Sequence, residues 1–172
     1  MTRRPTDEQF DAFVTDAWRP LYRTAYLLLG EHTAAEDLTQ AALTKTYAAW
    51  PRIRETAAAH GYARTTLLNE ARTLFRKASW RRELASGDLP EPPPADGVDP
   101  SDRPTVLAAL RELPAGQRAV IALRFYEDLN VEQTAALLDC SAGTVKSQTS
   151  AGPTKLRRLL GDAILPEGAL HD

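Results

Sequence analysis

The sequence predicts an all-α protein built as two small helical domains joined by a Pro-rich acidic linker, the C-terminal domain containing a helix-turn-helix. Apolar residues recur at helical spacing along most of the chain, and no stretch of useful length alternates as a strand does. Six of the twelve prolines fall in residues 86–104, which is typical of an extended connector. We therefore expect one domain at 1–85 and a second at 105–172.

The first two helices follow from apolar spacing and end signals. The first carries its apolar stripe from Phe10 to Leu29 and should end at Gly30, because glycine readily adopts the left-handed conformation of a helix C-cap. Thr33 and Glu36 have the spacing of a capping box that would open the second helix. Pro51 should end that helix.

The remainder of the first domain is predicted as a loop over residues 51–59, followed by a third helix from about His60 into the region of Arg81. Tyr47 and Trp50 lie at core spacing in the second helix, so we expect both to pack inside. The third helix is strongly basic: residues 60–82 hold six cations against the single acid Glu70.

The second domain opens after Pro104. A helix whose apolar face includes Val106 and Leu113 is expected first, and Pro114 separates it from a second helix over 117–126. Residues 86–104 before it hold five acids against Arg103. Basic faces on both sides of an acidic connector are consistent with two nucleic-acid contacts, and the alternative explanation of either face alone is a solvated helix surface.

The helix-turn-helix is predicted over residues 130–160. Asn130 and Gln133 have capping-box spacing, and Asp139 stands where such motifs turn, in a conformation that Asp tolerates better than most residues. Ser141 can then cap a second helix that points Val145 inward. An ordinary helical hairpin with a solvated basic face is the alternative explanation of this stretch.

The second helix of this motif contains a Gly152-Pro153 pair. A proline in a helix interior costs about 3 kcal/mol and a glycine about 1 kcal/mol relative to alanine. The residue before a proline also disfavours α geometry. The sequence therefore predicts a kink or break near Ser150.

Composition excludes several classes of function. The net charge is −2, no apolar run reaches the length of a membrane span, and the single cysteine, Cys140, forms no internal disulfide and is expected to be a small buried residue. His32, His60 and His171 lack metal-ligand spacing, no glycine-rich phosphate loop is present, and no Ser or Cys lies in a nucleophile motif. We expect no catalytic residues, no metal and no cofactor.

Three segments resemble a known family in order and spacing: AAEDLTQAAL at 34–43, YARTTLLNEARTLFRK at 62–77, and LRELPAGQRAVIALRFYEDLNVEQTAALLDCSAGTVKS at 110–147. They are similar to segments of the extracytoplasmic-function (ECF) RNA polymerase sigma factors, in particular the sigma-E-like group. The resemblance covers nearly the whole chain. It implies a cytoplasmic protein that binds core RNA polymerase and directs promoter-specific initiation, with residues 1–85 as region 2 and 105–172 as region 4.

The resemblance also implies partners and contact residues. Region 2 would dock on the β′ clamp helices and read the promoter −10 element, and region 4 would contact the β flap and the −35 element. An anti-sigma factor is a further candidate partner. The implied polymerase contacts are Asp37, Leu38, Gln40 and Ala41. The implied −10 contacts are Arg54, His60, Tyr62, Arg64, Asn69, Arg72, Arg76 and Lys77, and the implied −35 contacts are Thr144, Lys146, Ser147, Gln148 and Ser150.

The recognition helix departs from the family pattern, which usually continues with arginines where this chain has Gln148 and then Ala151-Gly152-Pro153. We therefore expect weaker or altered −35 recognition. Two functions remain open at this point. The first is an initiation factor, and the second is a regulator of the same fold that binds polymerase or another partner but reads the −35 element poorly because its helix is broken.

Overall fold

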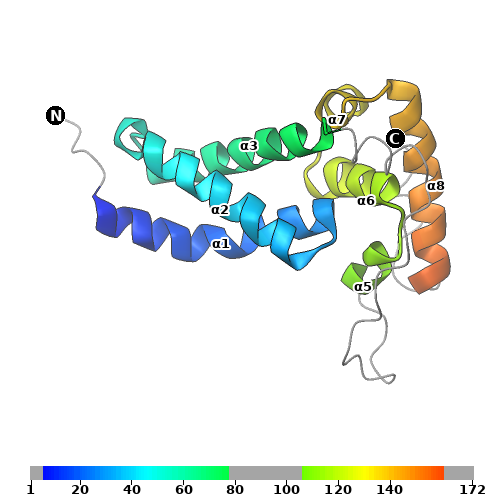
Figure 1. The fold of residues 1–172 in the computed structure, drawn as a ribbon, viewed down its shortest axis with the longest axis horizontal. Coiled ribbons are helices and arrows are strands. Elements are labelled where there is room, and N and C mark those ends of the chain that lie inside the picture. The colour runs from blue at the N-terminus through cyan, green and yellow to red at the C-terminus, as the bar shows by residue number, and fades with distance from the viewer. Residues whose placement is uncertain (1–5, 78–105, 161–172) are drawn as a thin grey trace, which may run out of the picture.

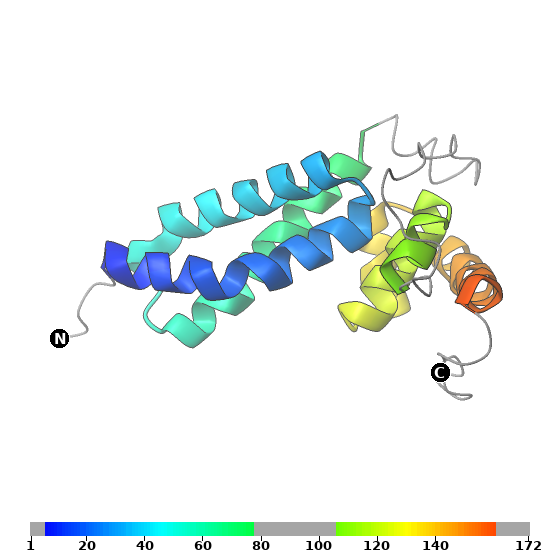
Figure 2. The same cartoon turned by 90° about the horizontal axis from the view of Figure 1, so that it is seen from below.

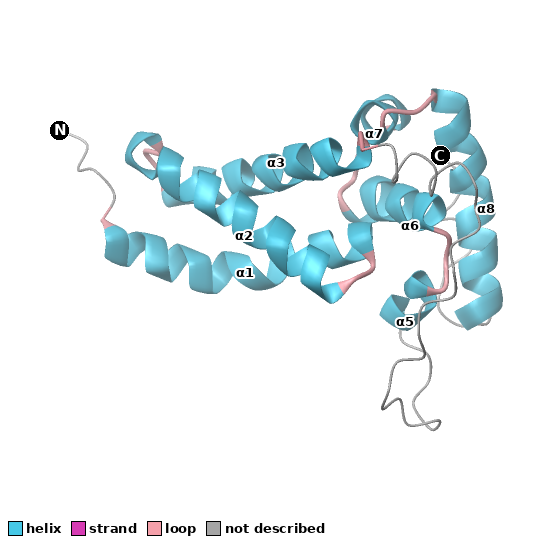
Figure 3. Cartoon of the chain, in the orientation of Figure 1, coloured by secondary structure: helices cyan, strands magenta, loops and turns pink. Residues whose placement is uncertain are grey.

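The computed structural model describes residues 6–77 and 106–160. In the first range, α1 (Asp7–Leu29), α2 (His32–Ala49) and α3 (Thr56–Phe75) form a three-helix bundle, with a short 3₁₀ turn, η1 (Trp50–Arg52), after α2 (Figure 1). The second range contains α5 (Val106–Arg111), α6 (Ala115–Ile121), the π-helical turn η2 (Ala122–Tyr126), α7 (Val131–Leu138) and α8 (Ala142–Leu160). Helices and loops make up these two ranges, which confirms the predicted all-α class (Figure 3).

α1 is closed at both ends by local signals. Thr6 and Gln9 form a capping box at its start, which the sequence prediction missed. At its end Gly30 adopts φ 70°, and its N–H donates to the Tyr26 carbonyl, as expected for a left-handed cap. The predicted end of this helix is confirmed.

Two predicted helix starts were wrong. Thr33 and Glu36 do not open α2; Glu31 does, because its carboxylate accepts from the N–H groups of Thr33 and Ala34 and satisfies two orphan donors at once. α3 begins at Thr56 rather than near His60, so the expected loop is shorter than predicted. The sequence there is rich in alanine, which favours an earlier helix start.

The predicted packing of two aromatic residues is half right. Trp50 is 2% exposed, and its ring meets the rings of Phe10 and Phe13. Tyr47 is 48% exposed and was wrongly assigned to the core. Its ring contacts Phe10, and its hydroxyl donates to Asp7 Oδ1 at the start of α1.

The helix-turn-helix is present with the predicted end signals. Asn130 and Gln133 form a reciprocal capping box at the start of α7, and Asp139 takes φ 54° and ψ 47° at its end. The Ser141 hydroxyl accepts from the Thr144 N–H at 3.0 Å and so caps α8. Val145 is fully buried, which locks α8 onto the rest of the domain.

α8 overturns the predicted break near Ser150. It runs as one α-helix from Ala142 to Leu160 with Pro153 inside it. The conflict between a proline and the residue before it arises partly from that residue's Cβ, and here the preceding residue is a glycine. Gly152 thus removes part of the steric penalty that its neighbour imposes.

Packing against α6 explains why a glycine suits position 152. Gly152 and Pro153 are both buried, and a Cβ at position 152 would lie 2.8 Å from Ile121 Cδ1 and 3.4 Å from Gln117 Cβ. α8 therefore approaches α6 closely at Gly152. The pair that looked like a helix breaker in the sequence is a contact point between two helices.

The two domains pack against each other. α6 lies against the C-terminal end of α1, and α7 lies beside α3, as the two perpendicular views show (Figure 1, Figure 2). The buried apolar residues form one continuous cluster through both domains. The predicted linker at 86–104 lies outside the described residues, and so does the predicted extension of α3 toward Arg81.

Candidate nucleic-acid and polymerase interfaces

The implied polymerase contacts lie on two sides of α2. Asp37 and Gln40 are exposed, and Ala41 is half-buried. Leu38 is 3% exposed, so its side chain belongs to the core and is not a projecting knob. Asp37, Leu38 and Ala41 instead line a groove of about 400 Å³ between α2 and the C-terminal half of α3.

The far wall of this groove belongs to α3. Glu70, Thr73, Leu74 and Lys77 line it, and Glu70 forms an ion pair with Lys45 of α2. Leu38 thus gives the groove an apolar floor, while acidic and basic groups stand at its rim. The arrangement suits a partner surface with apolar side chains and flanking charges.

The implied −10 contacts divide between two faces of α3. At 100° per residue, Tyr62, Asn69, Arg72 and Arg76 fall on one stripe. All four are exposed, and Tyr62 is 42% exposed. An aromatic ring, an amide and two guanidinium groups on one solvent-facing stripe are the residue types that stack on bases, read their edges and hold phosphates.

At the same 100° per residue, His60 lies about 165° and Arg64 about 125° from the centre of that stripe. The His60 ring packs on Phe13, with ring centroids 4.9 Å apart. Arg64 Nε forms an ion pair with Glu127 of the C-terminal domain, and its Nη2 donates to the Glu127 carbonyl at 2.5 Å. The structure therefore does not bring these two residues together with the other implied −10 contacts.

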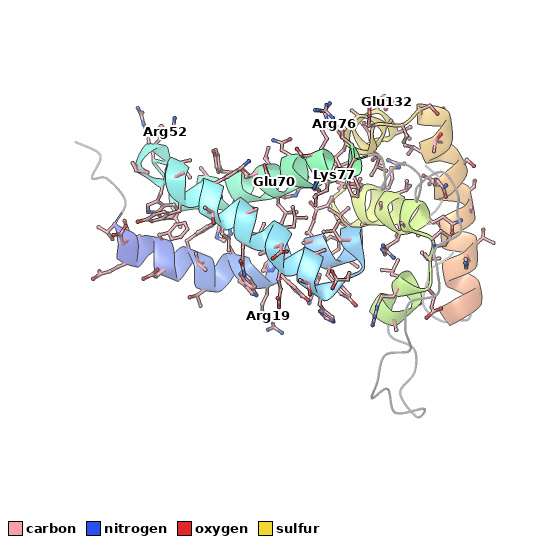
Figure 4. All side chains as sticks on the ribbon, viewed as in Figure 1. Arg19, Arg52, Glu70, Arg76, Lys77 and Glu132 are labelled. Carbon is pink, nitrogen blue, oxygen red and sulfur yellow. The ribbon has the colours of Figure 1, made fainter. Side chains whose placement is uncertain are left out.

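Further cations border the α3 stripe. Arg76 and Lys77 directly follow α3, and Arg52 projects from the same side of the bundle as Arg76 at its other end, whereas Arg19 points the opposite way (Figure 4). Arg54 is also exposed, in the short segment before α3. Arg52 was not among the implied contacts; its position directly before the α3 loop is the signal that would have found it.

The implied −35 contacts lie along the first half of α8. Thr144, Lys146, Ser147 and Ser150 are exposed, and Gln148 is half-buried. Thr144 also makes a hydroxyl–hydroxyl hydrogen bond with Ser141 at 2.9 Å, which ties it to the helix cap. This part of the exposed face carries short polar side chains and one lysine, so it supplies little positive charge.

Cys140, in the turn before α8, is half-buried rather than buried. Burial and the neighbouring Asp139 raise the pKa of its thiol above the ordinary value. A raised pKa keeps the thiol protonated at neutral pH and therefore unreactive. This agrees with a packing role.

Glu127 is the functional candidate that the sequence did not reveal. It follows the π-helical turn η2 and is 6% exposed, although it is charged. Its carboxylate accepts from Thr24 Oγ1 at 2.5 Å and from Arg64, both in the N-terminal domain. No local pattern could have shown this, because the partners lie 103 and 63 residues away.

The described residues contain neither a metal-type cluster nor a helix of the membrane-spanning type. Within residues 6–77 and 106–160 no cluster of His, Cys, Asp and Glu side chains has the arrangement of a metal site. Among the helices of the same part of the chain, none is both long and apolar enough to span a membrane.

The chain matches the family models of Sigma-70 region 2 over residues 13–81 and Sigma-70 region 4 over residues 104–156. It is 35% identical to the RNA polymerase sigma-E factor of Streptomyces coelicolor over 153 residues, which cover 88% of this chain and 86% of that protein. It is 33% identical to the ECF RNA polymerase sigma factor SigL of Mycobacterium tuberculosis, covering 81% and 82% of the two chains.

A solved structure shares the fold. The sigma factor RpoE of Bartonella quintana, crystallised in complex with the anti-sigma factor NepR, matches with a TM-score of 0.53 and 28% identity over 91% of this chain and 99% of that one. Both halves of the molecule thus match sigma-factor regions in the order in which the sequence segments predicted them. The chain belongs to the ECF RNA polymerase sigma factors, the subunits that direct transcription initiation at promoters.

Proposed function

We propose that this sigma factor divides its work among three surfaces: the face of α2 binds polymerase, the exposed stripe of α3 reads the −10 element, and α8 contacts the −35 element. The observation that carries the proposal is the α3 stripe, where Tyr62, Asn69, Arg72 and Arg76 face solvent together. Residues 1–85 act as region 2, residues 86–104 as the linker, and residues 105–172 as region 4.

The groove between α2 and α3 is the proposed seat of the polymerase β′ clamp helices. Asp37 supplies an exposed polar partner, and Leu38 with Ala41 supplies the apolar floor. Gln40 is exposed on α2 outside this groove and is proposed to add a second polar contact. Such a surface gains affinity by burying the floor and specificity from the charged rim. The C-terminal domain contacts the β flap.

On the −10 side, Asn69 is the proposed base reader, because an amide both donates to and accepts from a base edge. Tyr62 supplies a stacking surface for an unstacked base. Arg54, Arg72, Arg76 and Lys77 hold phosphates and make binding dependent on salt. His60 and Arg64 belong to this set only in a conformation in which their present packing is released.

On the −35 side, Thr144, Lys146, Ser147, Gln148 and Ser150 are the proposed contacts. Their short side chains allow close approach to a major groove, but a single lysine neutralises little phosphate charge. We therefore expect this helix to contribute less affinity than the −10 surface. The alternative of a regulator with a broken recognition helix loses its support, since α8 is continuous.

The protein is proposed to act in the cytoplasm and to carry out no chemistry of its own; the catalytic centre is that of the polymerase. An anti-sigma factor is a proposed regulator. Support for that partner comes from the Bartonella quintana RpoE structure, which is a complex with the anti-sigma factor NepR.

Promoter-directed transcription with purified core polymerase tests this function. The full chain should produce specific transcripts from promoters of the host genome, and core polymerase alone should not. Co-purification with core polymerase without any specific transcript would instead support the regulator.

A further inference from the structure

Glu70 is an acid on the helix that is proposed to read the −10 element. It is the only acidic residue of α3, and it directly follows Asn69, the proposed base reader. At 100° per residue, Glu70 lies about 115° from the centre of the exposed stripe, so it stands on the flank of that stripe. Its side chain is 25% exposed. A carboxylate in this position repels the phosphates of DNA that lies along α3.

The positive charge that compensates Glu70 comes from another element. Within α3, which the structure describes throughout, the residues one turn away on either side are uncharged: Thr66, Leu67, Thr73 and Leu74. Lys77 lines the same groove as Glu70, but it comes seven residues later, about 10 Å farther along the helix. The ion pair that Glu70 forms is with Lys45 of α2.

The ion pair between Lys45 and Glu70 is open to solvent. It joins Lys45 Nζ to Glu70 Oε1, and 58% of the lysine side chain is exposed. An ion pair this exposed contributes little to folding stability. It does, however, cancel the negative charge that Glu70 would otherwise present beside the α3 stripe. Its effect should therefore be seen in DNA binding more than in folding.

The distance between Glu70 and DNA on the α3 stripe is short enough for this charge to matter. A helix with its side chains is about 10–12 Å across, so the flank of α3 lies within about that distance of a strand on the adjacent face. The Debye length is about 10 Å at 0.1 M salt. Phosphates along the stripe are thus only partly screened from an unpaired carboxylate on its flank.

We propose that Lys45 strengthens promoter binding through Glu70, by neutralising the one acid of α3, so that the α3 stripe presents positive charge to the phosphates without a negative charge beside it. This role rests on the proposed function, because it takes the α3 stripe as the DNA-facing surface. It adds to that function a residue of α2 that acts without touching DNA.

The test compares the two halves of the ion pair. Lys45→Met removes the cation and keeps an unbranched side chain, and Glu70→Gln removes the acid and keeps its shape. Each single variant breaks the same ion pair, so a purely structural role would change promoter binding in the same direction in both. Charge compensation predicts opposite directions. The double variant Lys45→Met/Glu70→Gln removes both charges.

The measured quantity is the dissociation constant of assembled holoenzyme for a duplex promoter fragment that the wild-type chain transcribes. Lys45→Met should weaken binding about threefold, Glu70→Gln should tighten it about threefold, and the double variant should bind as the wild type does. The plot of log affinity against log salt concentration should become shallower for Lys45→Met and steeper for Glu70→Gln, each by less than the roughly 0.9 of one phosphate contact.

Two further variants are matched controls. Lys45→Arg keeps the positive charge and should bind the promoter as the wild type does. Arg19→Met removes a cation from the opposite side of the bundle and should leave promoter affinity unchanged (Figure 4). Thermal melting of all variants checks that folding stability changes little.

Three results would overturn the proposal. Weaker promoter binding by both single variants would give the ion pair a structural role. A double variant as weak as Lys45→Met would show that Lys45 acts on DNA directly, and unchanged affinity in every variant would show that the pair has no part in binding. Each of these refutes the role of Lys45 alone, since the wild-type chain still initiates. A wild-type chain that directs no specific transcript would refute the proposed function, and this role with it.

Discussion

The structural role of several polar residues in this protein is decided by the hydrogen-bond partners that their side chains can reach. Glu31 caps α2 in place of the expected Thr33, because its longer side chain reaches two N–H groups. Glu127 lies among residues of the other domain because Thr24 and Arg64 satisfy it there. The sequence named the polar residues, but it could not tell which donor each would find.

Asn69→Ala should impair promoter opening more than it impairs binding to duplex promoter DNA. The side chain is exposed and alanine is a better helix former, so the substitution should not destabilise α3. Loss of a base-edge contact should lower the rate or extent of opening by about tenfold, or about 1.4 kcal/mol. This lies at the lower end of the roughly 1–3 kcal/mol of a bidentate base contact. Permanganate reactivity of unpaired thymines measures opening, and a mobility shift measures duplex binding.

Thermal melting of the same Asn69→Ala protein is the control for folding. Equal losses of opening and of duplex binding would assign Asn69 a structural role.

Glu31→Ala should destabilise the protein by about 1 kcal/mol at pH 7, the typical value of a helix N-cap. Hydrogen bonds from the N–H groups of Ala34 and Thr33 hold the pKa of Glu31 below its ordinary value of 4.5. A lowered folded-state pKa means that this stability is present above about pH 4.5 and is lost as the pH falls through the folded-state value.

Urea unfolding of the wild type and of Glu31→Ala at several pH values checks this. The difference in unfolding free energy between the two proteins should shrink below pH 4.5. A difference that stays constant with pH would exclude a charge-dependent cap.

At the scale of elements, helix ends and helix continuity were predictable to different degrees. The capping box of α7, the left-handed Asp139 and the Gly30 cap were predicted and are present, because they depend on residues within one turn. The break in α8 was wrongly predicted. Propensity alone penalises Gly152 and Pro153, whereas contact with α6 stabilises a helix that places a residue without a side chain there.

Gly152→Ala should destabilise the protein, although alanine favours a helix by about 1 kcal/mol. The new Cβ would lie 2.8 Å from Ile121 Cδ1, and α6 or Ile121 would have to move. Ile121→Val removes that methyl group, so in its presence Gly152→Ala should be less harmful or stabilising. The expected coupling is about 1 kcal/mol in a double-mutant cycle measured by urea unfolding.

Gly143→Ala is the matched control in the same helix. Its Cβ would meet only Ser141 Oγ at 3.7 Å, so it should not lower stability. Additive effects of the Gly152 and Ile121 substitutions would show that the close approach has no energetic weight.

For the whole molecule, the sequence predicted two domains but not their contact. The linker length allows the domains to lie far apart, and nothing in the linker specifies that they dock. The two domains dock through Glu127, Arg118 and the apolar residues around Leu29. These residues can be recognised as interdomain contacts only when the structures of both domains are known.

A protein consisting of residues 1–85 should retain binding to core polymerase. Within the described residues, the proposed docking groove is lined by residues of α2, of α3 and by Lys77 just after α3, and by none of the C-terminal domain. Affinity capture on immobilised core polymerase, with residues 105–172 for comparison, measures this. No recovery of the 1–85 protein, with its helicity intact by circular dichroism, would place the main polymerase contact elsewhere.

The sequence by itself determined the all-α class, the helix-turn-helix with its caps, and membership of the sigma-factor family, because periodicity, capping and ordered motifs are local properties of a chain. Tertiary structure alone decided that Leu38 lies in a groove floor, that Gly152 is a helix contact, and that Arg64 is bound by Glu127. Each of these features depends on a partner far away in the sequence. The energy of such a contact depends on how close the two residues lie in the folded protein, which no local sequence pattern reveals.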